Sequence, residues 1–480
     1  MTSAEPPPSG AFFTADHVDA APEAVLETTA NIDLDPNSTA FSDFFEISKI
    51  TAWIREHSFT RVALQLPDDF LRYTVPLVTQ LEDALEGVKT FILADTSYRS
   101  CCVDAVAAEH ARCDALVHFG EACLSAPTND IPVLFVFGKL SVDLSNFEAE
   151  LAEVKDKIDL GLEMVLLFEP GYSGVSESLS STVSKTYPEI KLTVCQMGQN
   201  SPSEVTSLGR VLPSGWDATQ SATLLFIGNA SSALLPIWQL THPRFIQVIH
   251  YSPFEKTIAV DSPQSMRGLR KRLFLIEKLR DANVVGLVVG TLGVGQVREA
   301  IARIRELCKV AQKKLYVLSI GKVNEAKLSN FANDIDAFIL LSCPFGIFLD
   351  AGQFFKPVVS LFEAEIALNP CKDWYAAGGW TAQFAEFVND KIGEQDFDAV
   401  DVSLISGRIR ATNITEDQTG PDGDAAKQLL EYGASNYFAN RTWKGLDNTY
   451  IEEDMTLNDG LKGVAMEYKS EPPKPEGSNC

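Results

Sequence analysis

Short runs of apolar residues alternate with helix-like segments along most of this 480-residue chain. The first group of runs reads RVALQLPDD (61–69), VKTFILADTSY (88–98), DALVHFG (114–120) and IPVLFVFGKL (131–140). Runs of this length that stay apolar without alternating indicate strands buried on both faces. Strands of this kind separated by helices are typical of a parallel sheet covered by helices.

The same pattern starts again twice further along the chain. EMVLLFEPGYS, IKLTVCQM, ATLLFIGN and FIQVIHYSP form a second group, and VVGLVVGTLG, KLYVLSIGKV, DAFILLSCPFG and VVSLFEAEIAL form a third. A chain this long also exceeds the size at which one hydrophobic core stops growing. We therefore predict an α/β fold of three pseudo-repeated, Rossmann-like domains with parallel sheets, at residues 45–155, 156–265 and 266–390.

The two ends of the chain differ from this pattern. Residues 1–44 are rich in Pro, Ala, Ser, Thr and acidic residues, and the first basic residue is Lys49. Such a composition predicts a disordered acidic leader. Residues 391–480 contain scattered Gly, Asn and acidic residues and predict a largely irregular C-terminal extension.

Charge and hydropathy exclude several classes of partner. The net charge of −25 repels phosphate backbones, so we expect no nucleic-acid partner. The longest weakly polar run, NVVGLVVGTLGVG (283–295), is shorter than the roughly 20 residues that a membrane span needs, so we expect no membrane association. The N-terminus has no signal-peptide pattern. We expect a cytoplasmic protein whose cysteines are reduced.

Four of the nine cysteines lie in the segment DTSYRSCCVDAVAAEHARCDALVHFGEACLS (95–125). Cys101 and Cys102 follow one predicted strand, Cys123 follows another, and Cys343 follows a strand of the third domain. Functional residues of open α/β sheets gather at the carboxyl ends of strands. These four thiols are therefore candidate metal ligands. Cys113, Cys195 and Cys308 fall where core packing is the simpler interpretation, and Cys371 and Cys480 have no informative context.

The ligand type limits the metal. The spacing lacks the paired CxxC pattern of structural zinc sites. An iron–sulfur cluster held by cysteines from different domains agrees better, because such ligands need not be close in sequence. Near the third-domain strands, GTLGVG (290–295) lacks the full Gly-rich phosphate-binding fingerprint, so a tightly packed turn is the preferred interpretation.

The 95–125 segment resembles a signature of the diphthamide synthase family. LRKRLFLIEKLRDANVVGLVVGTLGVGQ and LLSCPFGIFLDAGQFFKPVVSLFEAEIAL resemble the third domain of that family, and NRTWKGLDNTY (440–450) resembles its C-terminal motif. The resemblance implies three α/β domains around a central 4Fe–4S cluster that uses S-adenosylmethionine. It also implies transfer of a 3-amino-3-carboxypropyl group to a histidine of elongation factor 2, the first step of diphthamide formation.

One departure from the family pattern concerns the middle domain. Catalytic members carry a cysteine there, whereas SPSEVTSLGRVLPSG (201–215) places Arg210 at that position. The resemblance is therefore to the accessory subunit of a eukaryotic heterodimer, with Cys101, Cys343 and either Cys102 or Cys123 as cluster ligands. It implies that S-adenosylmethionine is bound mainly by a catalytic paralogous subunit, and that a small electron-donor protein supplies electrons. The expected role is to support reduction of that partner's cluster.

Two other functions agree with parts of the sequence. A quinolinate synthase-like dehydratase also has three pseudo-repeated α/β domains and an iron–sulfur cluster. The TSYRSCC segment and the lack of a middle-domain cysteine at the position of Arg210 disfavour it. A metal-free scaffold that stabilises a catalytic partner agrees with Arg210 and with acidic ends that could dock onto another protein.

Overall fold

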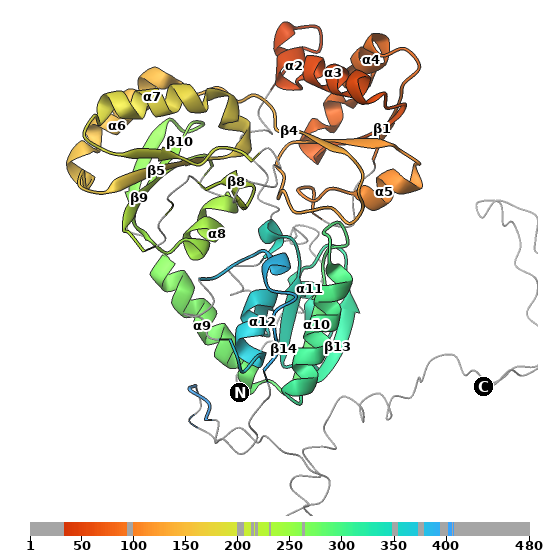
Figure 1. Cartoon of the computed structure of the whole chain (residues 1–480), viewed down its shortest axis with the longest axis vertical. Helices are drawn as coiled ribbons and strands as arrows, with labels where there is room; N and C mark the ends of the chain where they lie inside the picture. The colour runs from red at the N-terminus through yellow and green to blue at the C-terminus, as the bar shows by residue number, and fades with distance from the viewer. Residues whose placement is uncertain are drawn as a thin grey trace, which may run out of the picture. The chain divides into compact units, whose positions relative to one another are not determined.

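Three separate sheets of mainly parallel strands, and one two-stranded hairpin, make up the strands of the described residues (Figure 1). The computed structural model describes residues 33–93, 99–198, 206–212, 216, 219–229, 232–261, 265–347, 354–372, 379–393, 402–405 and 407. Most of the predicted C-terminal extension, including the 440–450 motif, lies outside the described residues. Among the described helices, none has the length and apolar character that crossing a membrane requires.

The first sheet is covered by helices on both faces. Its order is β2-β1-β3-β4, all parallel, with β1 (Arg61–Gln65), β2 (Lys89–Ile92), β3 (Ala115–Phe119) and β4 (Val133–Val136). One face packs on α2 (Thr39–Phe44), α3 (Ile47–His57), the 3-10 helix η2 (Asp68–Tyr73) and α4 (Thr74–Ala84). The other face packs on α5 (Ala105–His110). Figure 1 shows α5 on the opposite side of the strands from α2, α3 and α4. Alternate residues of the central strands β1 and β3 are thus buried on opposite faces, which explains their continuous apolar runs.

The predicted leader of residues 1–44 extends too far. Residues 39–44 form α2, which Ser38 caps by accepting a hydrogen bond from the N–H of Phe41. Phe41 and Phe44 are buried in the core of the first sheet. The apolar spacing of these aromatic residues outweighs the disorder-prone composition around them. Residues 1–32 lie outside the described part of the chain.

The second sheet has the order β11-β10-β9-β5-β6. Its strands are β5 (Glu163–Phe168), β6 (Leu192–Val194), β9 (Ala222–Ile227), β10 (Phe245–Ser252) and β11 (Thr257–Asp261). The other elements of this region are α6 (Leu144–Glu153), η3 (Lys155–Lys157), η4 (Pro170–Val175), α7 (Ser176–Thr186), α8 (Leu234–Thr241), β7 (Thr206–Ser207) and β8 (Arg210–Val211). The sequence analysis missed the antiparallel edge strand β11 and the β7–β8 hairpin.

The predicted boundary at residue 155 falls too late in the chain. Helix α6 precedes it, yet Phe147 and Leu151 of that helix pack against Met164 and Leu166 of β5. Helix α6 therefore belongs to the core of the second sheet. A helix before a domain's first strand gives no sign in the sequence of which sheet it covers.

The third sheet has the order β13-β12-β14-β15, all parallel. Its strands are β12 (Val284–Val289), β13 (Lys314–Ser319), β14 (Ala337–Leu341) and β15 (Val358–Ser360). The other elements are α9 (Ser265–Asp281), α10 (Val297–Val310), α11 (Glu325–Ser329), η5 (Pro344–Gly346), α12 (Leu361–Leu368) and η7 (Phe384–Glu386). Leu287 packs with Leu307 of α10 and Ile366 of α12 on one face, and Leu340 packs with Leu328 of α11 on the other.

The three sheets share one strand order. In each of them the first strand along the chain lies between the second and the third, and the fourth follows the third. The direction of strand addition therefore reverses beside the first strand of every sheet, and ligands of such sheets bind where this reversal occurs. The predicted α/β class with parallel sheets is confirmed, and loops after the first and third strands become the natural place for a site.

Candidate metal centre

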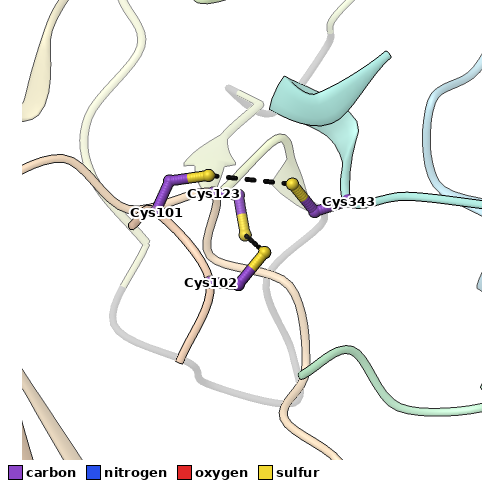
Figure 2. Close-up of side chains that lie close together, drawn as sticks. All are labelled: Cys101, Cys102, Cys123 and Cys343. Carbon is purple, nitrogen blue, oxygen red and sulfur yellow. Dashed lines mark hydrogen bonds between the residues drawn. The ribbon is translucent and has the colours of Figure 1, made fainter. Parts of the chain in front are cut away.

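Four buried thiols from two of the sheets meet at one point (Figure 2). The Sγ atoms of Cys101 and Cys343 are 3.7 Å apart, and those of Cys102 and Cys123 are 4.0 Å apart. All four sulfur atoms lie within 4.8 Å of one another. These separations exclude disulfides, whose sulfur atoms are about 2.05 Å apart. The structure thus brings together all four cysteines proposed from the sequence, including both candidates for the third position.

Strands β1 and β3 hold the loop that carries Cys101 and Cys102. The side-chain amide of Gln65, the last residue of β1, donates to the carbonyl of Cys102 at 2.7 Å and accepts from the N–H of Asp104 at 2.9 Å. Nε2 of His118 in β3 lies 3.0 Å from the carbonyl of Ser100. Burial lowers the pKa of His118, so the ring is neutral and Nε2 carries the proton that it donates.

The other two cysteines follow the third strands of their sheets. Cys123 comes after β3, and its N–H donates to the carbonyl of Cys101 at 3.0 Å. Cys343 comes after β14 and precedes η5, where the N–H of Gly346 donates to the carbonyl of Cys343 at 2.9 Å. Backbone hydrogen bonds, rather than the sulfur atoms, therefore fix the positions of both thiols.

The electrostatics of the thiols favour a bound cation. Hydrogen bonds with the thiols of Cys101 and Cys102 lower the pKa of Cys123 well below its ordinary value. The pKa of Cys101 is raised well above its ordinary value by hydrogen bonding to Cys102 and other thiols and by burial. Without a cation, repulsion and desolvation oppose the loss of further protons. A metal removes that obstacle, because its charge compensates the thiolates that ligate it.

The donor set agrees with thiophilic metal groups. Four cysteine thiolates are the ligand set of a 4Fe–4S cluster. The same set also binds a single tetrahedral ion, whose metal–sulfur bonds of about 2.3 Å place the sulfur atoms about 3.8 Å apart. A cluster is larger than one ion, so the thiols would separate to hold it. Cys101 and Cys102 lie in the loop before α5, and Cys123 lies in the loop after β3, so none of these three thiols belongs to a helix or strand.

The β7–β8 hairpin of the middle domain, which carries Arg210, contacts the loop that holds Cys123. Arg210 in β8 is fully buried, with Nη1 donating to the carbonyl of Leu208 at 2.8 Å and Nη2 to that of Phe168 at 3.3 Å. Its neighbour Gly209 has a φ of +73°, and a Cβ there would lie 2.2 Å from Cδ1 of Leu124. The β7–β8 hairpin therefore packs directly on the residue after Cys123, and the Arg210 cation beside it interacts with Glu121, Cys195 and Glu169.

Two buried carboxyl groups accompany Arg210. Burial raises the pKa of Glu169, which follows β5, to about 8, and that of Glu121 to about 7, while Arg210 opposes both shifts. Neither carboxyl oxygen of Glu169 has a hydrogen-bond partner. The nearby Ser232 hydroxyl lowers the pKa of Glu169 in part but does not cancel the effect of burial. Glu169 is therefore largely protonated at neutral pH.

We expect Glu169→Gln to stabilise the protein at pH 8 and to change its stability little at pH 5. Because burial raises the folded-state pKa from 4.5 to about 8, the stability linked to the protonated carboxyl is complete below pH 4.5 and is lost as the pH rises through 8. Glutamine resembles the neutral acid and does not ionise. The difference in the free energy of unfolding between variant and wild type should grow by about a few kcal/mol from pH 5 to pH 8, and the difference in melting temperature should grow with it. An equal difference at both values would contradict the assignment.

Other residues proposed or passed over in the sequence can now be placed. Cys195 and Cys308 are buried in the main apolar cluster, Cys113 is partly exposed and Cys371 is exposed; none belongs to the four-thiol group. The sequence analysis missed Gln65, Glu169 and Thr291. Each ends or follows the first strand of its sheet. That shared position is the signal that could have found them.

Fold and site together define a class of protein: an α/β protein of three mainly parallel sheets with four buried cysteine thiols close enough together to hold a thiophilic metal group. The sequence model of the family described as "Putative diphthamide synthesis protein" matches residues 66–378. The chain therefore belongs to the diphthamide synthesis protein family.

Named relatives agree with this family. A Caenorhabditis elegans protein named 2-(3-amino-3-carboxypropyl)histidine synthase subunit 2 is 44% identical, over 97% of this chain and 99% of its own length. A Xenopus laevis protein of the same name is 36% identical, over 89% of this chain and 92% of its own. A crystal structure described as Dph2 from Pyrococcus horikoshii with a 4Fe–4S cluster covers 73% of this chain and 95% of its own, with a TM-score of 0.53 and 21% identity. That likeness supports the fold.

Proposed function

We propose that this chain is the accessory iron–sulfur subunit of a heterodimeric enzyme of diphthamide biosynthesis. Convergence of Cys101, Cys102, Cys123 and Cys343 is the observation that carries the proposal. Family membership and the names of the relatives supply the pathway. The reaction would transfer a 3-amino-3-carboxypropyl group from S-adenosylmethionine to a histidine of elongation factor 2.

The four cysteines would hold a 4Fe–4S cluster. The Pyrococcus horikoshii protein of similar fold is described with such a cluster, and the thiol set here is of the type that binds it. When bound, the cluster would supply one-electron transfer. The chain's own contribution is to bury the thiols and to position their loops through Gln65 and His118.

The ligand set favours an accessory role over a catalytic one. Four protein thiols for four irons would leave no iron open to bind a substrate directly. In the middle domain, Arg210 stands where catalytic members of the family carry a cysteine. The ligand set with one cysteine from each domain, which would leave one iron open to substrate, is therefore incomplete here. We therefore place S-adenosylmethionine mainly on a paralogous catalytic subunit and assign this chain the task of keeping that partner's cluster reduced, with electrons from a small donor protein.

Iron analysis tests the cluster. Anaerobic reconstitution of the full chain should yield about four irons and a broad visible absorption that dithionite bleaches. Cys101→Ser combined with Cys343→Ser should remove most of this iron, since it deletes half of the ligands. Cys371→Ser, at an exposed cysteine outside the group, should bind iron as the wild type does. Single changes at Cys102 and Cys123 show whether both are ligands. Unchanged iron in the double variant would refute the assignment.

A single tetrahedral ion is a second candidate. The sulfur separations of 3.7 and 4.0 Å are close to the tetrahedral edge expected for one ion. Zinc would give one ion per chain and no visible absorption, because its d-shell is full. Metal analysis of protein isolated without air therefore distinguishes the two candidates. One zinc and no iron would favour a structural centre and the scaffold function.

A further inference from the structure

A threonine of the third domain contacts one thiol of the metal centre. Thr291 follows β12 and is 1% exposed. Its Oγ1 donates to Sγ of Cys102 over 3.9 Å, and it accepts a hydrogen bond from the N–H of Gly293 at 3.2 Å. Because the hydroxyl oxygen is already an acceptor, its single hydrogen is available to the sulfur. A Cys102 sulfur that ligates a metal group carries no hydrogen and can only accept, so Thr291 would be the donor of this bond.

The loop that carries Thr291 is held tightly against the first domain. Val294 forms a β-bridge with Pro127, and the N–H of Gly295 donates to the carbonyl of Ala126 at 2.8 Å. A Cβ at Gly293 would lie 2.7 Å from the carbonyl oxygen of Val103, so only glycine allows this approach. The glycines of GTLGVG thus serve close packing beside the cysteine loop. The loop presents the Thr291 hydroxyl to Cys102 from a fixed position.

We propose that Thr291 sets the reduction potential of the metal group by hydrogen bonding to the Cys102 sulfur. The inference rests on the proposed iron–sulfur function. Reduction adds one electron to a buried group whose charge is shared by its sulfur ligands. A hydroxyl hydrogen directed at one of these sulfurs stabilises the more negative, reduced state and so raises the potential. Gln65 and His118 donate to backbone carbonyls of the loop that carries Cys101 and Cys102. They therefore position this loop without contacting sulfur.

Three variants of the full chain separate this effect from loop positioning. Thr291→Val removes the hydroxyl and keeps the shape, whereas Thr291→Ser keeps the hydroxyl. Thr128→Val is the matched control, because the exposed Thr128 hydroxyl donates to the carbonyl of Leu292 in the same loop and makes no bond to sulfur. The measurement is a redox titration of anaerobically reconstituted protein, followed by electron paramagnetic resonance, with iron content determined for each sample.

At the wild-type midpoint potential, Thr291→Val should show about a tenfold lower ratio of reduced to oxidised cluster, which is a shift of about 59 mV for one electron. Thr291→Ser and Thr128→Val should titrate like the wild type. An unchanged midpoint in Thr291→Val, at full iron content, would overturn the inference, and so would an equal shift in Thr128→Val.

Loss of iron is also decisive. If Thr291→Val loses the cluster while Thr291→Ser retains it, the hydroxyl serves assembly and the inference fails. A wild-type chain that holds no redox-active cluster would instead refute the proposed function itself.

Discussion

Changing Cys101 and Cys343 to alanine in the heterodimer should reduce modification of elongation factor 2 to the level seen without reductant when a protein donor supplies the electrons. With dithionite, most of the modification should remain. The reason is the division of labour proposed above: this chain would lose half of its cluster ligands, and the partner's own site would stay intact. A small chemical reductant reaches the partner without a relay, whereas a protein donor depends on it.

The comparison requires an intact complex. Size-exclusion chromatography of the double variant should show the heterodimer in wild-type amount, and Cys371→Ser provides a variant with one thiol fewer outside the centre. Loss of modification with both reductants, in a complex that remains assembled, would place this chain's centre in the chemical step. Full modification with both would favour a scaffold.

The fold class was predictable because parallel strands leave a clear pattern. MVLLF in β5 and AFILL in β14 are buried at every position, so their apolar character does not alternate. Thr257–Asp261 of β11 shows the opposite case. Its residues are only partly buried or exposed at the sheet edge, and its short sequence TIAVD carries too little apolar character to indicate a strand. The antiparallel strand added at the edge of a parallel sheet is therefore the kind of edge strand that this reasoning misses.

The site was predictable in part for a topological reason. Cysteines that follow strands must lie at the carboxyl edge of a sheet, so the positions of Cys101, Cys102, Cys123 and Cys343 in the sequence were enough to make them candidates. Whether Cys102 or Cys123 joined the group could not be decided, because adjacent residues in a turn can point in different directions. The structure brings both into the group.

Contacts between domains had no signature in the sequence. Thr291 lies 189 positions from Cys102, and nothing in GTLGVG indicates that its threonine faces a sulfur atom. Arg210 was noticed only as a departure from a family pattern, and its burial beside Glu121 and Glu169 depends on packing of the β7–β8 hairpin. Contacts with the thiols and their loops come from the first and third sheets and from the β7–β8 hairpin, so only the assembled fold reveals them.

The largest effect on stability should come from Glu363 in the third domain. This side chain is fully buried, forms an ion pair with buried Arg272 of α9, and accepts a hydrogen bond from Nε1 of Trp380 at 3.1 Å. It also closes a capping box at the start of α12, where it accepts from the N–H of Ser360 at 2.7 Å. One carboxylate thus joins α9, α12 and the segment that carries Trp380.

Glu363→Gln should destabilise the protein by about 3–5 kcal/mol, because it removes the negative charge that faces a buried guanidinium. Glutamine has one oxygen and so can accept from Ser360 or from Trp380 but not from both, and the loss therefore includes one hydrogen bond beside the charge. Glu299→Gln, at an exposed position of α10, should stay within about 0.5 kcal/mol of the wild type.

Combining Glu363→Gln with Arg272→Met distinguishes a charge effect from a packing effect. Methionine removes the buried cation while retaining an apolar stem between α9 and α12, so the double variant should recover most of the stability that Glu363→Gln loses. Thermal unfolding of the four proteins at one pH supplies the double-mutant cycle. If the two losses add instead, shape at Glu363, not its charge opposite Arg272, stabilises this part of the third domain.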